Sequence, residues 1–173
     1  MVPNQWFITT VGKLGTDKKP AVKAGPFGSA LKKEFYTQSG YKIYGQEQVI
    51  SNNPFYGDYY IDEQKFNSLK SCAVSPGDIL LSLVGTIGKV LLLPKNCEEG
   101  IINPRLLRLS LDSEIVFNLF FKYFLEFDHT AKALHRKAQG GTMGVINAES
   151  IKSLPILIPP IEEQKKIAEI LST

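Results

Sequence analysis

The sequence predicts an α+β domain with a mixed or largely antiparallel sheet and packed helices. Two observations lead to this fold class: a β-hairpin in the middle of the chain, and helical patterns that do not alternate regularly with strands. A doubly wound fold needs repeated strand–helix–strand units, and none is visible. With 173 residues the chain can form one domain with a sizeable core.

The first half of the chain consists of short segments separated by turn residues. The first thirty residues are apolar stretches broken by Gly and Pro, and Gly25, Pro26 and Gly28 predict a turn with exposed backbone N–H groups. We expect two short strands, a loop and a short helix to follow, at residues 41–44, 48–50, 51–60 and 62–69.

The strongest β signal lies at residues 79–94. Two apolar runs flank Gly85-Thr-Ile-Gly88, whose glycines suit the positive φ angles of a hairpin turn. Residues 105–111 predict a third strand, although their alternation of apolar and polar residues is imperfect.

Helices are expected to follow these strands. Residues 113–127 are apolar nearly all round, so this helix, with its phenylalanines, should be buried on more than one side. Asp128 is expected to cap a second helix that ends near Gly140. Asn147 should cap a short third helix, and residues 155–159 predict a last strand.

The C-terminal residues predict an amphipathic helix that begins at Pro160, a residue suited to the first helical turn. One side of this helix carries Ile161, Gln164, Ile167, Ala168 and Leu171. A stripe on a helix of about fourteen residues, roughly 20 Å long, needs a surface to pack against. The helix therefore either folds back on its own domain or is the beginning of a longer arm that joins a partner.

The composition is that of an ordinary soluble globular protein, with 43% hydrophobic and 21% charged residues. No apolar run approaches the ~20 residues of a membrane span, and the N-terminus does not resemble a secretory signal. Cys72 and Cys97 lack metal-ligand spacing and are expected to be reduced. We therefore expect a cytoplasmic protein without a metal or cofactor.

The distribution of charge is more informative than the net charge of +3. Between residues 13 and 33 there are six lysines and one acid, Asp17. A second basic group ends the predicted helix before Gly140 and consists of Lys132, His135, Arg136 and Lys137. This layout fits a protein that meets a polyanion with one face. The alternative is a solvated lysine-rich loop and cations that complement a helix C-terminus.

Three motifs that suggest catalysis are incomplete. Gly85-Thr-Ile-Gly-Lys89 is too short for a phosphate-binding loop, and Val90 follows its lysine in place of Ser or Thr. Asn53-Pro-Phe-Tyr56 lacks the second proline of the adenine-binding element of amino-methyltransferases, and no cofactor-binding unit precedes it. Asp58 and Glu63-Gln-Lys65 lie in a polar stretch and not in the buried sheet of a metal-dependent nuclease site. The sequence therefore indicates a binding module and not an enzyme.

Several motifs in a fixed order resemble one family. They are Gly25-Pro-Phe-Gly-Ser29, Tyr44-Gly-Gln-Glu47, the block from Pro76-Gly-Asp78 to Gly85-Thr-Ile-Gly-Lys-Val90, Ile102-Asn-Pro-Arg105, Gly140-Gly-Thr142, Asn147 and Pro159-Pro-Ile-Glu-Glu-Gln164. Together they resemble the target recognition domain of the DNA specificity subunit of type I restriction–modification enzymes.

The resemblance implies a non-catalytic protein. A full specificity subunit has two such domains, each followed by a long helix, and the two helices form a coiled-coil spacer. Each domain reads one half of a split sequence in double-stranded DNA. Adenine methylation and ATP-dependent cleavage belong to the modification and restriction subunits that dock on it. This sequence has one such domain, residues 1–159, and the start of one spacer helix, residues 160–173, so it resembles a half-subunit or a fragment.

The resemblance and the charge pattern together nominate binding residues. For phosphate contact we expect the 25–29 loop, with Gly25 and Ser29, and the lysines Lys23, Lys32 and Lys33. For base reading we expect Gln46, Gln48 and Arg105. Residues that suit either task are Arg136, Lys137, Gln139 and Thr142. Phe27 and Tyr44 are expected to be packed inside the domain.

The C-terminal helix is expected to be an arm whose stripe, Ile161, Gln164, Ile167, Ala168 and Leu171, begins the contact with a second copy or a second half-subunit. A protein–protein adaptor that uses this helix without reading DNA is the alternative function.

Overall fold

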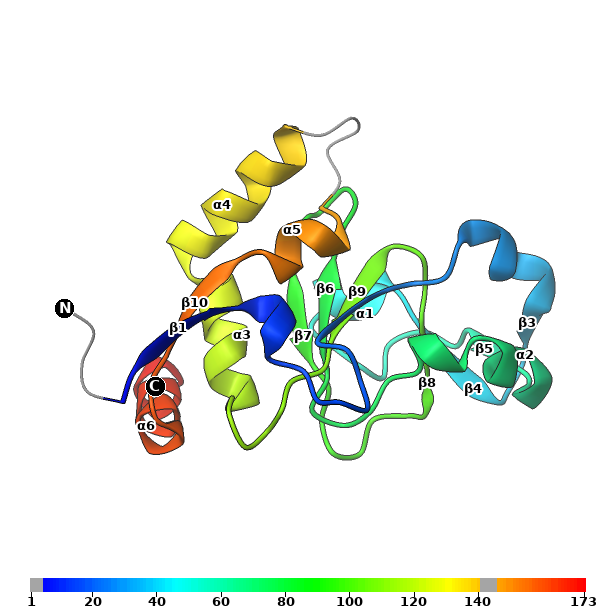
Figure 1. The fold of residues 1–173 in the computed structure, drawn as a ribbon. Helices are drawn as coiled ribbons and strands as arrows, with labels where there is room; N and C mark the ends of the chain where they lie inside the picture. The colour runs from blue at the N-terminus through cyan, green and yellow to red at the C-terminus, as the bar shows by residue number, and fades with distance from the viewer. Residues whose placement is uncertain (1–4, 141–145) are drawn as a thin grey trace.

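A four-stranded antiparallel sheet stands at the centre of the fold and is shared by two hydrophobic cores. The computed structural model describes residues 5–140 and 146–173, and Figure 1 shows the arrangement of its elements. The central sheet has the strand order β2–β9–β6–β7, with β2 at Val22–Ala24, β9 at Leu106–Leu109, β6 at Ile79–Ser82 and β7 at Val90–Leu92.

Both faces of this sheet are buried. Ile79 and Leu81 belong to the first core, whereas their neighbour Leu80, together with Leu91 on the adjacent strand, belongs to the second. Because a strand buried on both faces has no solvent side, its sequence does not alternate between apolar and polar residues. This explains the imperfect pattern at residues 105–111.

The first core lies between the central sheet and a group of helices. A two-stranded antiparallel sheet also contributes to it, in which Ile8 pairs with Leu157 across 149 positions of sequence. The elements on this side are β1 (Phe7–Thr10), η1 (Val11–Lys13), α3 (Asn118–Glu126), α4 (Asp128–Gln139), α5 (Ala148–Lys152), β10 (Pro155–Ile158) and α6 (Ile161–Leu171).

The second core is covered by a second four-stranded sheet, in the order β3–β5–β4–β8. Strands β4 and β8 are parallel and the other pairs are antiparallel, so the sheet is mixed. Its elements are η2 (Gly28–Ala30), η3 (Lys33–Phe35), β3 (Tyr36–Thr37), β4 (Tyr41–Tyr44), α1 (Gln46–Ile50), β5 (Tyr60–Ile61), α2 (Glu63–Ser68), η4 (Lys70–Cys72) and β8 (Gly100–Ile102). The predicted α+β class with a mixed or antiparallel sheet is confirmed.

A buried ionic cluster supports the central sheet. Arg108 is 2% exposed and donates through Nη1 to the carbonyl oxygens of Ser71 and Ala73. The Asp78 carboxylate lies 4.0 Å from Nε of Arg108, accepts the Ser110 hydroxyl at 2.8 Å and pairs with Lys19 at 2.8 Å. Burial lowers the pKa of Arg108, and the charge of Asp78 opposes that shift.

The C-terminal helix packs against its own domain, so the expectation that its stripe contacts a partner helix is wrong for Gln164 and Ala168. Gln164 is fully buried on α6: its Oε1 accepts the Phe117 N–H at 2.8 Å, and its Nε2 donates to the carbonyls of Ile115 and Pro159, both at 2.8 Å. Ala168 is also buried. Hydrogen bonds of Gln164 to Ile115 and Phe117 thus fix α6 beside the segment that leads into α3.

The rest of the stripe is partly open. Ile161 is half-buried, and Ile167 and Leu171 line a groove of about 160 Å³ with aromatic side chains of α3. Leu171 is 56% exposed, and Ile170, which lies at the border of the stripe, is 71% exposed.

Other local expectations are confirmed or corrected. The hairpin is confirmed, with φ angles of 69° at Gly85 and 82° at Gly88, and Asn147 caps α5 by accepting the Ser150 N–H. Residues 48–50 belong to helix α1 and not to a strand. The helix expected from residue 113 begins only at Asn118.

Two expectations about the junction of α3 and α4 are wrong. Asp128 is the first residue of α4 and does not cap it; its carboxylate pairs with Lys132 instead. Phe127, expected in the core, is 65% exposed because it lies in the sharp connection between the two helices. No helix in the described ranges is long and apolar enough to cross a membrane.

Candidate nucleic-acid interface

One end of the central sheet brings together four segments that are far apart in sequence. We call them the loop edge: residues 25–30, 44–46, 83–89 and 103–105. Backbone hydrogen bonds join them, from Gly25 N–H to Leu106 O (3.1 Å), from Asn103 N–H to Tyr44 O (2.9 Å) and from Leu83 N–H to Arg105 O (3.1 Å). The loop edge is therefore a connected surface and not a set of independent loops.

Gly25 is required by the close approach of two of these segments. A Cβ atom at this position would lie 1.9 Å from the carbonyl oxygen of Asn103. Since its N–H is bonded to Leu106, the expectation that this N–H is free for a phosphate is wrong. Gly25 positions the loop edge, and the exposed residues beyond it, including Ser29, are available to a ligand.

Replacement of Gly25 by alanine should lower the free energy of unfolding by about 1–3 kcal/mol, because the new methyl group overlaps a backbone carbonyl that cannot rotate away. Gly28→Ala is the matched control, since nothing lies within 4 Å of a Cβ there and the effect should stay within about 0.5 kcal/mol. Urea unfolding of both variants measures the difference; equal stabilities would contradict the assigned role of Gly25.

The two glutamines nominated as base readers lie in different environments. Gln46 begins α1 at the loop edge, where its Nε2 donates to the Val84 carbonyl in the hairpin and its Oε1 is buried without a partner in the described structure. Gln48 is fully buried: its Oε1 accepts the Gly45 N–H and its Nε2 donates to the Tyr56 carbonyl, both at 2.7 Å. Gln48 shapes the start of α1 and is not available to DNA.

Tyr44 is packed inside the domain, as expected, whereas Phe27 is not. Burial raises the pKa of the Tyr44 hydroxyl, which donates to the Glu98 carbonyl at 2.7 Å. Phe27 is 87% exposed at the loop edge, so the prediction that it is packed is wrong.

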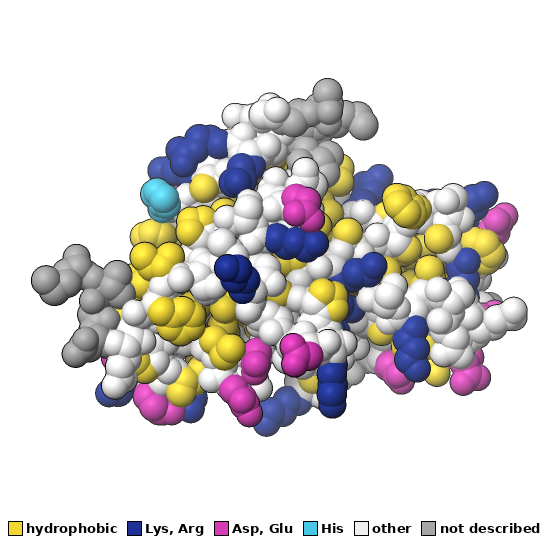
Figure 2. All heavy atoms as spheres, viewed as in Figure 1, with side chains coloured by type: hydrophobic (Ala, Val, Ile, Leu, Met, Phe, Trp, Pro, Cys, Tyr) yellow, Lys and Arg dark blue, Asp and Glu magenta, His cyan; other side chains and the backbone are white. Residues whose placement is uncertain are grey.

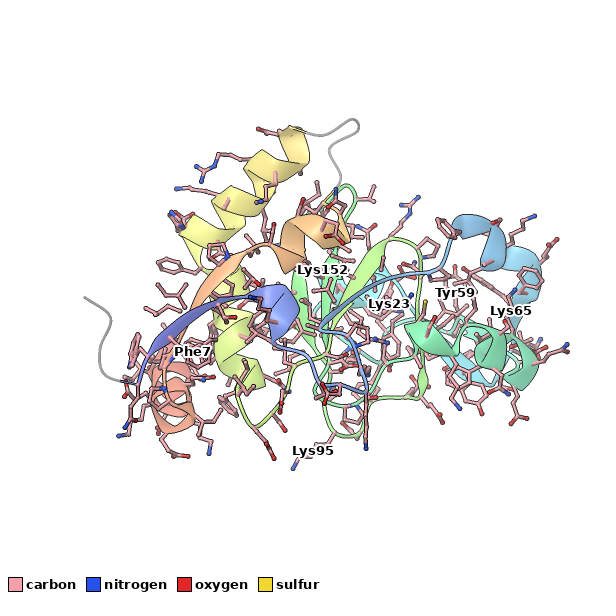
Figure 3. All side chains as sticks on the ribbon, viewed as in Figure 1. Phe7, Lys23, Tyr59, Lys65, Lys95 and Lys152 are labelled. Atoms are coloured by element: carbon pink, nitrogen blue, oxygen red, sulfur yellow. The ribbon has the colours of Figure 1, made fainter. Side chains whose placement is uncertain are left out.

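Cationic side chains surround the loop edge. Lys32, Lys33 and Arg105 are exposed, and Lys23 is half-buried on β2. Figure 2 shows Lys and Arg side chains spread over the whole of this face, whereas most Asp and Glu side chains lie in its lower half. Figure 3 places Lys23 over the central sheet and Lys95 at the opposite edge.

The hairpin tip adds residues that the sequence analysis did not nominate. A groove of about 490 Å³ separates it from α1, α3 and α4, and Lys89, Lys122 and His135 line this groove. Lys89 is exposed directly after Gly88. Lys89 belongs to an incomplete phosphate-binding motif, but a lysine beside an exposed turn is itself a signal for anion contact.

The end of α4 supplies the second basic group. Arg136, Lys137 and Gln139 are exposed there, close in sequence to the C-terminus of the helix. Thr142 lies outside the described residues. In Figure 1 the end of α4 and the hairpin both point toward the upper side of the molecule.

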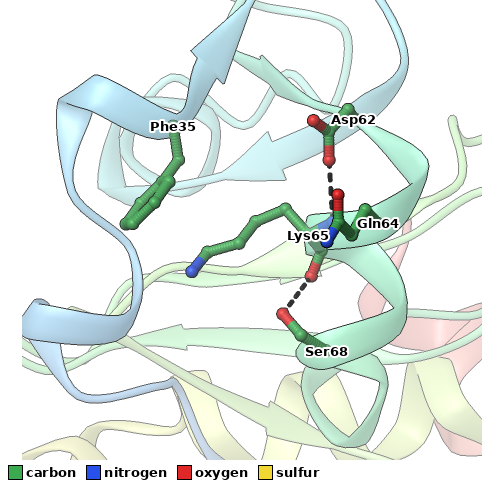
Figure 4. Close-up of a pocket in the computed structure, with 5 residues that line it drawn as sticks. All are labelled: Phe35, Asp62, Gln64, Lys65 and Ser68. Atoms are coloured by element: carbon green, nitrogen blue, oxygen red, sulfur yellow. Dashed lines mark hydrogen bonds between the residues drawn. The ribbon is translucent and has the colours of Figure 1, made fainter.

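A separate pocket of about 310 Å³ lies at the second-core end of the molecule (Figure 4). The Lys65 side chain crosses the pocket, with Nζ 3.6 Å from the centroid of the Phe35 ring. The Asp62 carboxylate accepts the Lys65 N–H, and the Ser68 hydroxyl donates to the Lys65 carbonyl. These contacts explain the pocket as α2 packing against η3. Within residues 5–140 and 146–173, no cluster of three or more His, Cys, Asp or Glu side chains could hold a metal ion.

Comparisons with known proteins identify related sequences. The chain is 32% identical over 116 residues to a putative type I restriction enzyme specificity subunit of Haemophilus influenzae, covering 66% of this chain and 29% of that protein. It is 25% identical over 179 residues to the MjaVIII specificity subunit of Methanocaldococcus jannaschii, covering 99% of this chain and 36% of that protein. The chain thus spans about a third of the length of these relatives.

The fold is also that of a solved structure. The HsdS subunit from Thermoanaerobacter tengcongensis matches with a TM-score of 0.67 at 17% identity, over 99% of this chain and 37% of that chain. A family model described as the type I restriction modification DNA specificity domain matches residues 26–173. The chain therefore belongs to the family of type I restriction–modification DNA specificity domains.

Proposed function

We propose that this domain binds double-stranded DNA through the loop edge and reads one half of a bipartite target. The observation that carries the proposal is the presence of the exposed cations Arg105 and Lys89, together with Gln46, on one connected surface. The exposed lysines Lys32 and Lys33 follow the 25–30 segment of this surface in sequence. The chain belongs to a family of DNA specificity domains, and we therefore assign duplex DNA as the polyanion that this surface binds.

Two tasks are divided among these residues. Lys23, Lys32 and Lys33, with Ser29, bind phosphates and set the register of the domain on the duplex. Arg105 reaches base edges in the major groove, where Arg pairs with guanine. Gln46 pairs with adenine there once its amide leaves the Val84 carbonyl. Arg136, Lys137 and Gln139 extend the contact along the end of α4. Because Gln48 is buried, it is not part of this proposal.

The remaining parts of the proposal concern assembly. Residues 1–159 form the recognition domain, and residues 160–173 begin a spacer on which modification and restriction subunits dock. Since Gln164 and Ala168 anchor α6 to its own domain, contact with a second copy or a second half-subunit falls to the open side, with Ile170 and Leu171. Catalysis belongs to the docked subunits.

The double substitution Lys32→Ala/Lys33→Ala should weaken binding to random duplex DNA and reduce the salt slope of log K by about 2, because two phosphate contacts are lost. Lys165→Ala/Lys166→Ala is the matched control, as both lysines are exposed on α6, away from the loop edge (Figure 1). Fluorescence anisotropy at several salt concentrations gives both slopes. If only the control variant, Lys165→Ala/Lys166→Ala, reduces the salt slope, the proposed surface is wrong.

Selection from random duplexes with modification subunits present tests the reading of a half-site. An enriched short sequence supports the proposal. Retained binding of the modification subunits with no salt-dependent DNA binding would instead identify the domain as a protein–protein adaptor.

A further inference from the structure

Phe27 is the most exposed of the large hydrophobic side chains in the described part of the chain. It is 87% exposed, whereas the next values are 71% for Ile170 and 67% for Ile8. An isolated exposed apolar residue is common on protein surfaces. Phe27, however, lies at the loop edge, the surface proposed to bind DNA.

The backbone around Phe27 is fixed on both sides. Two residues before it, Gly25 is bonded to Leu106 and packed against the Asn103 carbonyl. After it, the Phe27 carbonyl accepts the Ala30 N–H at 2.8 Å, and Leu31 is buried in the second core. The ring therefore projects from a turn anchored to the frame of the domain, and ordering it on a ligand costs little conformational entropy.

The charges near Phe27 in sequence and space are mostly positive. Lys23 precedes the turn, Lys32 and Lys33 follow it, and Arg105 lies on the segment against which Gly25 packs. The core of a protein–protein interface is depleted of charged residues. An apolar side chain inserted among nucleic-acid bases, by contrast, is surrounded by cations that hold the phosphates.

We propose that Phe27 contacts bases directly, with its ring buried against them in the bound duplex. This inference rests on the proposed function. The flanking lysines bind the phosphates while the ring inserts between neighbouring base steps, where it leaves water without neutralising a phosphate.

The test compares Phe27→Ala, Phe27→Leu and Phe55→Ala in the full 173-residue chain, with binding to random duplex DNA measured at several salt concentrations. Phe27→Ala should lower affinity about tenfold, because the apolar area that the ring buries is lost, while its salt slope and melting temperature stay those of the unsubstituted chain. Phe27→Leu should recover part of the loss, since an apolar side chain remains. Phe55→Ala, at an exposed aromatic residue in another loop, should bind as the unsubstituted chain does.

Three outcomes overturn the inference in different ways. If Phe27→Ala binds as tightly as the unsubstituted chain, Phe27 is not a base contact, and the proposed function still stands. If Phe27→Ala reduces the salt slope, the loss lies in phosphate contacts. If the unsubstituted chain shows no salt-dependent binding even at low salt, the proposed function fails and this inference fails with it.

Discussion

Replacing Asp78 by alanine should lower the free energy of unfolding by about 4 kcal/mol, because it removes the only carboxylate within 4.0 Å of the buried Arg108 in the described structure. The Ser110 hydroxyl and the Ser75 N–H lose their acceptor at the same time. For a chain of this length the melting temperature should fall by about 10 °C. Calorimetry and urea unfolding measure the change.

Asp128→Ala is the matched control for this substitution. Its side chain is 75% exposed and pairs with Lys132 on the surface of α4, so its loss should cost less than about 1 kcal/mol. If Asp78→Ala is no more destabilising than Asp128→Ala, the ionic cluster does not support the central sheet.

Replacing Gln164 by leucine should destabilise the protein by about 3 kcal/mol. Leucine fills nearly the same volume but leaves the Phe117 N–H and the carbonyls of Ile115 and Pro159 without partners. Since these bonds join α6 to the start of α3, hydrogen exchange of α6 should accelerate along with the loss of stability.

The exposed Gln64 on α2 offers a control for the second substitution, and Gln64→Leu should change stability by less than about 0.5 kcal/mol. A Gln164→Leu variant as stable as the unsubstituted chain would show that α6 is held by apolar contacts alone.

Features encoded locally were predictable from the sequence. Gly85 and Gly88 mark the hairpin because the turn needs positive φ angles, and Asn147 marks a helix start because its side chain bonds the next turn. The strand pairings were not predictable, since β1 has only four residues and its partner lies at the other end of the chain. Residues 48–50 were misassigned because a short apolar run suits either a helix or a strand.

In the proposed binding surface, the exposure of the charged residues was predictable, but the burial of polar residues and the exposure of Phe27 were not. Arg105, Lys32 and Lys33 are exposed, as their charges suggest. Gln48 and Gln164 are polar residues whose burial depends on backbone groups that only the tertiary fold supplies. Phe27 is the opposite case, an apolar residue that the anchored turn holds in solvent.

The pairing of β1 with β10 has a consequence for how the chain folds during synthesis. All residues of the second core lie between Leu31 and Leu106, so this core can assemble once the first two-thirds of the chain have emerged. The first core includes Val11 and Ile158 and cannot close until almost the whole chain is available. Contacts between such distant positions slow folding. During synthesis, β1 therefore stays unpaired until β10 has left the ribosome.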